Sequence, residues 1–265
     1  MSDMLKGLWA YRGFVLSSIK NEFVSRFARS KLGGFWMILQ PLSQVLIYAL
    51  ILSAVLSAKL PGIESKYAYA IYLTAGFLGW VLFAEIIDRC ISLFIQQGNL
   101  MKKMKFPKIT LPTIVVGSAL LNNVMLLLAI LVVFAALGHF PTVQLVWLPV
   151  LTFAMVVLAL GLGLVLGILN VFVRDIGLVM PIVLQVMFWF TPIVYPISII
   201  PEGLQHLVET FNPIYPIIRG YQEVLVYGQA PHLGQVGIIM TIGLLILAFG
   251  LFLFRRASAE LVDAL

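Results

Sequence analysis

Residues 170–196 read NVFVRDIGLVMPIVLQVMFWFTPIVYP, and the adjacent charges of Arg174 and Asp175 interrupt two long apolar runs in this stretch. A charged side chain at the centre of a bilayer costs about 3 kcal/mol or more, which excludes this pair from the middle of a transmembrane helix. We therefore predict a turn at Arg174 and Asp175, where one membrane span ends and the next begins.

The composition of the whole chain indicates a membrane protein. Of the 265 residues, 62% are hydrophobic and 11% are charged, whereas a soluble domain carries about 25% charged residues. We predict an all-α polytopic membrane protein. The lone Cys90 lies in an apolar run, which excludes a disulfide framework and indicates a buried structural thiol.

Apolar runs of about 20 residues, long enough to cross a bilayer, predict six transmembrane helices. They cover approximately residues 34–58, 68–95, 111–137, 145–172, 177–200 and 236–254. Residues 33–256 then form one transmembrane domain, between an N-terminal segment 1–32 and a cytoplasmic tail 257–265. Basic residues are spread through residues 1–31, so we expect no cleaved signal peptide and a first span that acts as the insertion signal.

Residues 5–29 show helical spacing of apolar side chains opposite a basic face, which predicts an amphipathic helix. We expect this helix to lie in the plane of the membrane surface, with its Lys and Arg side chains toward anionic lipid headgroups. A simple positive topology signal explains the same charges, and the sequence leaves both interpretations open.

Basic residues are concentrated on one side of the predicted spans. The richer side holds the N-terminal segment, the loop 96–109, Arg174, Arg255 and Arg256, whereas the other side holds Lys59, Lys66 and Arg219. Because loops rich in Lys and Arg stay in the cytoplasm, both termini are predicted to be cytoplasmic.

Residues 197–235 connect the last two predicted spans, and they are too many for a turn and too apolar for a soluble domain. Proline and glycine recur through this segment, so no helix in it can be long. We predict short re-entrant helices over about residues 200–232, which dip into the outer leaflet with their backbone buried against protein. A flexible, solvated loop is the alternative.

The sequence shows no catalytic centre. It has no phosphate-binding GxxxxGK[ST] loop, its histidines are isolated, and no catalytic set of side chains has a plausible spacing. We expect no metal, no cofactor and no nucleic-acid partner for this chain. Gly163 and Gly167 have the GxxxG spacing that permits close helix approach, within the chain or between subunits.

Glu85, Asp88 and Arg89 are charges inside the second predicted span. Glu85 and Arg89 are one helical turn apart on the same face, so they can neutralise each other. Two placements fit this pattern: a water-filled path or bundle interface within the membrane, and an ion pair where the span emerges at its cytoplasmic end. The other predicted spans lack the acidic residues of a proton relay, which argues against a proton-coupled carrier.

Aromatic side chains crowd the outer half of the second predicted span and the fifth. Interface belts of Trp and Tyr account for many of them. Rings at several depths could instead line a passage, where their flat faces and polar tips suit sugar rings.

Three blocks of sequence carry a family resemblance: RSKLGGFWMILQPL at residues 29–42, the stretch 170–196, and NPIYPIIRGYQEVLVYG at residues 212–228. Over about residues 10–256 the chain resembles the membrane subunit of type 2 ABC exporters, in the polysaccharide branch that includes O-antigen exporters of the Wzm kind. The resemblance implies a homodimer in the bacterial inner membrane with two copies of a separate ATP-binding subunit, which would hold ATP and Mg²⁺. It also implies an undecaprenyl-type lipid-linked glycan as substrate, moved to the periplasm through a channel.

Candidate site residues follow from this resemblance. The channel-lining candidates are Tyr48, Tyr72, Trp80, Phe188, Trp189 and Tyr195. Arg26, Arg29 and Lys31 are candidates for the pyrophosphate of the lipid carrier, with ordinary lipid headgroup binding as the alternative. Coupling to the ATP-binding partner would use Lys102, Lys103, Lys105 and Pro107 in the loop 96–109, together with Arg174 and Asp175.

Other functions share part of this pattern. Export of capsule or teichoic acid, or efflux of small amphiphilic drugs, would use the same topology. A secondary carrier would need ion-coupling residues or inverted repeats, and the spacing of the predicted spans shows neither. In each ABC case we expect no ATPase activity from this chain alone.

Overall fold

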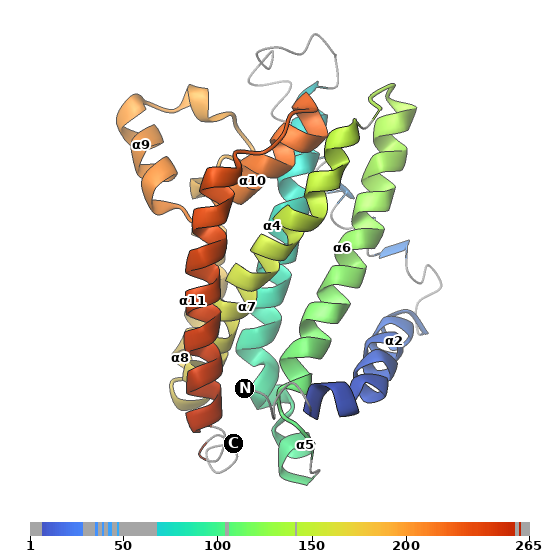
Figure 1. Ribbon diagram of the computed structural model, residues 1–265, viewed down its shortest axis with the longest axis vertical. Helices are drawn as coiled ribbons and strands as arrows, with labels where there is room; N and C mark the ends of the chain where they lie inside the picture. The colour runs from blue at the N-terminus through green and yellow to red at the C-terminus, as the bar shows by residue number, and fades with distance from the viewer. Residues whose placement is uncertain are drawn as a thin grey trace.

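The computed structural model describes residues 7–28, 35–36, 39, 42–43, 47, 68–103, 106–140, 142–257 and 260. Within these residues every regular element is a helix (Figure 1), as predicted for an all-α membrane protein. In this part of the chain, 4 helices are long and apolar enough to cross a membrane. The first predicted span, residues 34–58, lies mainly outside the described residues.

Four long helices form the body of the molecule, with α4 at its centre. They are α4 (Ala68–Gln96), α6 (Thr110–Ala136), α7 (Leu148–Phe172) and α11 (Leu233–Ala257) (Figure 1). Helices α6 and α7 pack along α4, and α11 packs along α7. These elements confirm the helices predicted at 68–95, 111–137, 145–172 and 236–254, because an uninterrupted apolar run is a strong signal for a long helix. A 3₁₀ turn, η1 (Val143–Trp147), leads into α7.

Glycines bring α7 into close contact with both of its neighbours. A β-carbon placed at Gly167 would lie 2.3 Å from the carbonyl oxygen of Cys90 in α4, and one at Gly163 would lie 2.7 Å from the Cys90 β-carbon. On the other side, a β-carbon at Gly161 would lie 2.7 Å from the backbone nitrogen of Leu247 in α11. The GxxxG spacing therefore serves packing within the chain, where small residues let helix backbones approach closely.

Helix α8 (Asp175–Phe190) follows α7 after the turn predicted at Arg174 and Asp175, which is confirmed. The prediction that this helix continues to residue 200 is wrong. Thr191 has an extended backbone, with φ −93° and ψ 129°, because Pro192 disfavours helical geometry at the residue before it. With its 16 residues α8 is about 24 Å long, less than the ~30 Å hydrocarbon core of a bilayer.

Short helices occupy the segment between α8 and α11. They are η2 (Ile197–Ile199), α9 (Glu202–Phe211), α10 (Tyr215–Gln222) and the π-helical turn η3 (Glu223–Tyr227). Helix α10 is mostly buried against α4, α7 and α11, so the flexible-loop alternative is wrong for this part. The side-chain oxygen of Asn212 accepts hydrogen bonds from the backbone N–H groups of Ile214 and Tyr215, at 3.0 and 3.2 Å, which satisfies donors at the start of α10.

Helix α2 (Arg12–Ala28) confirms that the N-terminal segment is helical. It packs against α6, with Val15 buried and Ile19 next to Gly117 of α6. The short helix α5 (Gly98–Lys103) follows α4 at the end of the bundle where α2 also lies, whereas α9 and α10 lie at the opposite end (Figure 1).

Candidate functional site

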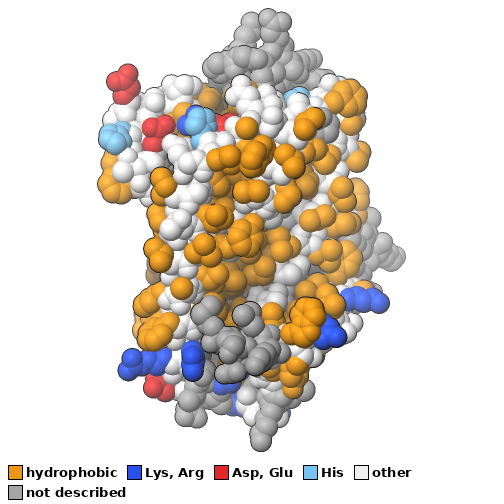
Figure 2. All heavy atoms as spheres, in the orientation of Figure 1, with side chains coloured by type: hydrophobic (Ala, Val, Ile, Leu, Met, Phe, Trp, Pro, Cys, Tyr) orange, Lys and Arg blue, Asp and Glu red, His pale blue; other side chains and the backbone are white. Residues whose placement is uncertain are grey.

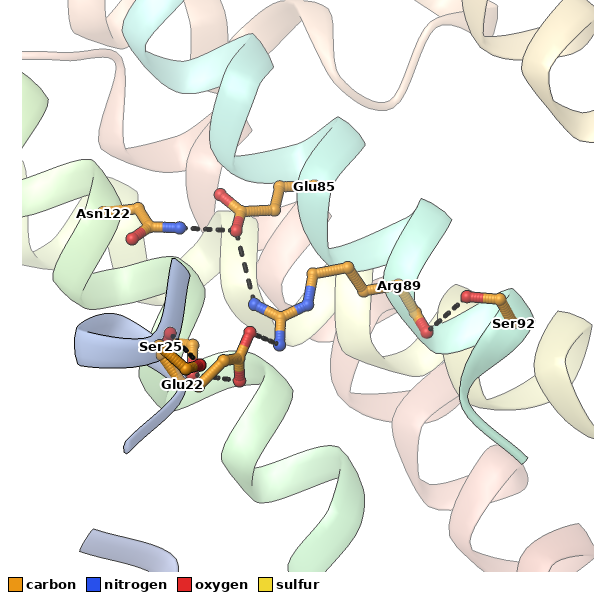
Figure 3. Close-up of polar contacts among 7 residues, drawn as sticks. Glu22, Ser25, Glu85, Arg89, Ser92 and Asn122 are labelled. Carbon is orange, nitrogen blue, oxygen red and sulfur yellow. Dashed lines mark hydrogen bonds and ion pairs between the residues drawn. The ribbon is translucent and has the colours of Figure 1, made fainter. Parts of the chain in front are cut away.

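An ion pair between distant parts of the chain joins α2 to α4. Oε1 of Glu22 lies 2.6 Å from Nη2 of Arg89, and Nη1 of the same guanidinium lies 3.4 Å from Oε1 of Glu85 (Figure 3). Arg89 therefore sits between two carboxylates, one from its own helix and one from the N-terminal helix. The predicted pairing of Glu85 with Arg89 is confirmed.

Two side chains of α6 complete this group. Ser118 donates a hydrogen bond from its hydroxyl to Oε2 of Glu22 at 2.9 Å, and the Asn122 amide donates to Oε1 of Glu85 at 2.6 Å. We call Glu22, Glu85, Arg89, Ser118 and Asn122 the charge cluster. Each carboxylate thus has a partner on α6 in addition to the guanidinium, and three helices meet at one level of the bundle.

The charge cluster is partly screened from solvent. The side chains of Arg89, Glu85 and Glu22 are 20%, 18% and 31% exposed. Hydrogen bonds between charged groups are short and strong, but partial exposure reduces their net worth to on the order of 1 kcal/mol for each pair. The cluster therefore contributes orientation among the three helices more than it contributes stability.

A cleft of about 550 Å³ lies beside the charge cluster, between α2 on one side and α4 with α5 on the other, and the first turns of α6 also line it. Its lining includes Phe14, Ser18 and Glu22 of α2, Asp88, Arg89, Ser92 and Gln96 of α4, and Leu100 of α5. Asp88 is exposed and lines this cleft. The predicted charges lie at the interface of α2, α4 and α6, and the choice between the two predicted placements stays open.

Glu22 was not predicted as a member of any site. The signal that could have identified it is its position: a carboxylate on the face of α2 that also carries Val15 and Ile19, the face that packs on the bundle. A charge on the apolar face of an amphipathic helix needs a partner when that face is buried. Nothing in the sequence indicated that its partner would be Arg89, because the two residues are 67 positions apart.

The predicted aromatic residues of α4 and of the α8 region lie together. The ring centroids of Trp80 and Phe188 are 5.5 Å apart, and both side chains are buried. Tyr72 donates to the carbonyl oxygen of Pro192 at 3.3 Å, and Tyr195 donates to that of Trp189 at 2.6 Å. We call Tyr72, Trp80, Phe188, Trp189 and Tyr195 the aromatic group. The Trp189 side chain is 48% exposed, and a channel-lining role for the group stays a prediction.

The predicted coupling residues lie at the end of the bundle that carries α5. Lys102 and Lys103 are exposed at the end of α5, and Arg174 and Asp175 are exposed at the start of α8. The segment after α5 contacts the N-terminal helical segment: Phe106 faces Phe14 with ring centroids 6.0 Å apart, and Pro107 adjoins Gly7. The loop predicted to couple to the ATP-binding partner therefore touches the N-terminal helical segment. Tyr48, Arg29, Lys31 and Lys105, and the side chain of Arg26, lie outside the described residues.

These features fit a helical membrane protein in which an ion pair joins the N-terminal helix α2 to the long apolar helix α4. The chain belongs to the ABC-2 type transporter family, whose sequence profile matches residues 14–226.

Full-length relatives refine this placement. The chain is 27% identical over 266 residues to an O-antigen export system permease protein of Myxococcus xanthus, and 26% identical over 267 residues to one of Klebsiella pneumoniae, with 100% of both chains covered in each case. It is also 22% identical over 244 residues to a polysialic acid transport protein of Escherichia coli, covering 92% of this chain and 93% of the relative.

Proposed function

We propose that this chain is the transmembrane subunit of an exporter that moves a lipid-linked polysaccharide from the cytoplasm to the periplasm. The first candidate for this polysaccharide is an O-antigen. The observation that carries the proposal is the end-to-end alignment with O-antigen export permeases. Family membership over residues 14–226 supports the second part of the proposal, that ATP is hydrolysed on a separate subunit. ATP and Mg²⁺ would then be held by that partner.

The proposed architecture is a homodimer of six-span chains with two ATP-binding subunits. Its orientation, with both termini cytoplasmic, is supported by the charge distribution. On the face seen in Figure 2, Lys and Arg side chains gather at the end of the bundle that carries α5, and a broad hydrophobic band separates them from the acidic and histidine side chains at the other end. Helix α11 carries exposed apolar side chains along its length, among them Ile238, Ile242, Leu245, Phe249 and Phe252.

The short helices α9 and α10 are proposed to be the re-entrant elements at the periplasmic end. Helix α10 is covered by three long helices, so its backbone meets the requirement that non-spanning segments at membrane depth be buried against protein. The fifth span would consist of α8 together with the turn segment that begins at Thr191. The first span would lie in residues 34–58.

The proposed path for the glycan runs along α8, where the aromatic group meets α4. Flat ring faces with polar tips suit stacking on sugar rings, and a continuous channel suits a polymer longer than the bilayer is thick. Tyr48 is a further candidate for lining this path. Within the aromatic group, the side chain of Trp189 is exposed. Arg26, Arg29 and Lys31 are proposed to meet the pyrophosphate of the lipid carrier at the cytoplasmic surface.

The test is a deletion of this chain followed by analysis of the lipid-linked glycans in the cytoplasm. We expect one glycan to accumulate on its lipid carrier and to disappear from the cell surface, and the plasmid-borne chain to restore export. Unchanged surface glycan in the deletion strain would contradict the proposal. A second prediction is that the purified chain hydrolyses no ATP until its cognate subunit is added.

A capsular polysaccharide is the second candidate substrate. The match to a polysialic acid transport protein favours it, although that relative is less similar and aligns over a smaller share of the chain than the O-antigen permeases. The same deletion distinguishes the two, because the chemical composition of the accumulated glycan identifies it as O-antigen or capsule.

A further inference from the structure

Helix α2 contacts its two neighbours, α6 and α4, through different kinds of interaction. Toward α6 it makes close apolar contact, through the buried Val15 and through Ile19 next to Gly117. Toward α4 it faces the cleft of about 550 Å³, which Leu111, Ile114 and Val115 of α6 also line, and the bond from Glu22 to Arg89 joins the α2 wall of that cleft to the α4 wall. Apolar surfaces can slide over each other, whereas a short charged bond fixes both a distance and a direction.

The guanidinium of Arg89 is itself held in place. Glu85, one turn earlier on α4, lies 3.4 Å from it, and Asn122 of α6 orients Glu85 through a 2.6 Å hydrogen bond. Glu22 is likewise oriented by Ser118 of α6. Because both ends of the bond have a second support, a displacement of α2 acts on α4 through Arg89 and does not merely rotate a free side chain (Figure 3).

Helix α4 connects this bond to the aromatic group. Arg89 lies on the same helix as Tyr72 and Trp80, and Trp80 packs on Phe188 of α8 with ring centroids 5.5 Å apart. A rotation or shift of α4 therefore changes the contact between Trp80 and Phe188. The cleft leaves room at the α5 end of the bundle for α2 and α4 to change their separation if the bond is lost.

We propose that Glu22 and Arg89 are positioning residues that make α2 and α4 move as one body, so that a push on α2 reaches the aromatic group. This inference rests on the proposed function, because the push would come from the ATP-binding partner. Neither residue binds glycan or nucleotide in this proposal. Their bond transmits displacement between the cytoplasmic end of the chain and the proposed glycan path.

The functional test compares Glu22→Gln, Arg89→Gln and the double variant in proteoliposomes with the ATP-binding partner. We expect each single change to reduce the glycan moved per ATP hydrolysed by about tenfold while ATP hydrolysis continues, and the double variant to be no worse than either single one. Asp88→Asn is the matched control, because it removes a carboxylate from the same cleft and the same helix. An unchanged ratio in both single variants, or an equal loss in Asp88→Asn, would overturn the proposal.

A distance measurement tests the same bond without glycan. Spin labels at Ser18→Cys and Ser92→Cys, in a Cys90→Ala background, report the separation of α2 and α4 across the cleft. We expect one narrow distance in the wild-type pairing that does not change when ATP binds to the complex, and a broader, ATP-dependent distribution after Glu22→Gln. Identical distributions with and without Glu22 would overturn the inference, whereas a wild-type complex that moves no glycan would overturn only the proposed function.

Discussion

The backbone N–H of Gly177 donates a hydrogen bond to the side-chain oxygen of Asn170 across 2.8 Å, and this bond closes the turn between α7 and α8. The amide nitrogen of the same Asn170 donates to the carbonyl oxygen of Ile91 in α4 at 2.9 Å. One buried side chain therefore accepts from a backbone donor at the start of α8, which also donates to the carbonyl oxygen of Arg174 at 3.2 Å, and ties that turn to the central helix. The exposed pair Arg174 and Asp175 owes its position to this arrangement.

Replacing Asn170 with Leu should loosen the turn and lower stability by about 1–3 kcal/mol, because the buried Asn170 side chain loses its hydrogen bonds to Ile91 of α4 and Gly177 of α8. The measurement is the apparent Tm of the purified protein in detergent. Asn21→Leu, at an exposed position of α2, is the control and should change the Tm little. Equal Tm values for the two variants would show that the Asn170 bonds do not support the turn.

Gly167→Ala should destabilise the protein by about 1–3 kcal/mol, because the new methyl group meets a backbone oxygen that cannot move aside. The nearest atom to a β-carbon at this position is the Cys90 carbonyl oxygen, 2.3 Å away. Gly237→Ala in α11 is the matched control, since a β-carbon there meets nothing within 4 Å. It should be neutral or slightly stabilising, because alanine favours helix by about 1 kcal/mol over glycine. Thermal unfolding of both variants distinguishes them.

Arg174→Ala should reduce both glycan export and partner-stimulated ATP hydrolysis several-fold, if the turn at the start of α8 contacts the ATP-binding subunit. The residue is exposed at the end of the bundle that carries α5, where a partner can reach it. Both activities are measured in reconstituted complexes, with the amount of bound partner determined in parallel. If neither activity changes, Arg174 serves only as a topology signal.

Arg219→Ala should disturb the segment between α10 and α11. Nε of Arg219 lies 2.9 Å from Oε1 of Glu223, whose side chain is only 10% exposed, and Nδ1 of His232 lies 2.9 Å from the same oxygen. Removing the arginine leaves a nearly buried carboxylate short of its main partner. Because Arg219 is itself 34% exposed, we expect a loss of about 1–2 kcal/mol, below that of a fully buried pair.

A second substitution checks the cause of this loss. Glu223→Gln in the Arg219→Ala background removes the uncompensated charge and should restore part of the Tm. If the double variant is less stable than Arg219→Ala alone, the loss comes from the packing of the arginine and not from its pairing with Glu223.

The long spans and the turn between α7 and α8 could be predicted from the order of residues alone. Helices α4, α6, α7 and α11 agree with the predicted runs to within a few residues, because the length of an apolar run is a local property. The end of α8 could have been predicted better, since Thr191 precedes Pro192 and the residue before a proline avoids helical geometry. The prediction placed the end of this helix at residue 200 because the apolar residues continue to that position.

The contacts of the charge cluster could be predicted from the sequence only in part. Glu85 and Arg89 were predicted to pair because helical geometry alone places them on one face. Their bonds to Glu22, Ser118 and Asn122 depend on how α2 and α6 are rotated against α4, and no local pattern contains that information. The same holds for Asn170, whose role depends on the proximity of Ile91 in another helix.

The amino-acid sequence alone predicts a helical membrane protein, the positions of its four long apolar helices, and a turn at Arg174 and Asp175. Those properties follow from hydrophobicity and charge summed along the chain, because the bilayer acts on each segment in the same way. Only the tertiary structure decided that Glu22 pairs with Arg89 and that Gly163 and Gly167 pack on Cys90. Such contacts depend on the rotation and height of one helix relative to another, which the packing of the whole bundle sets.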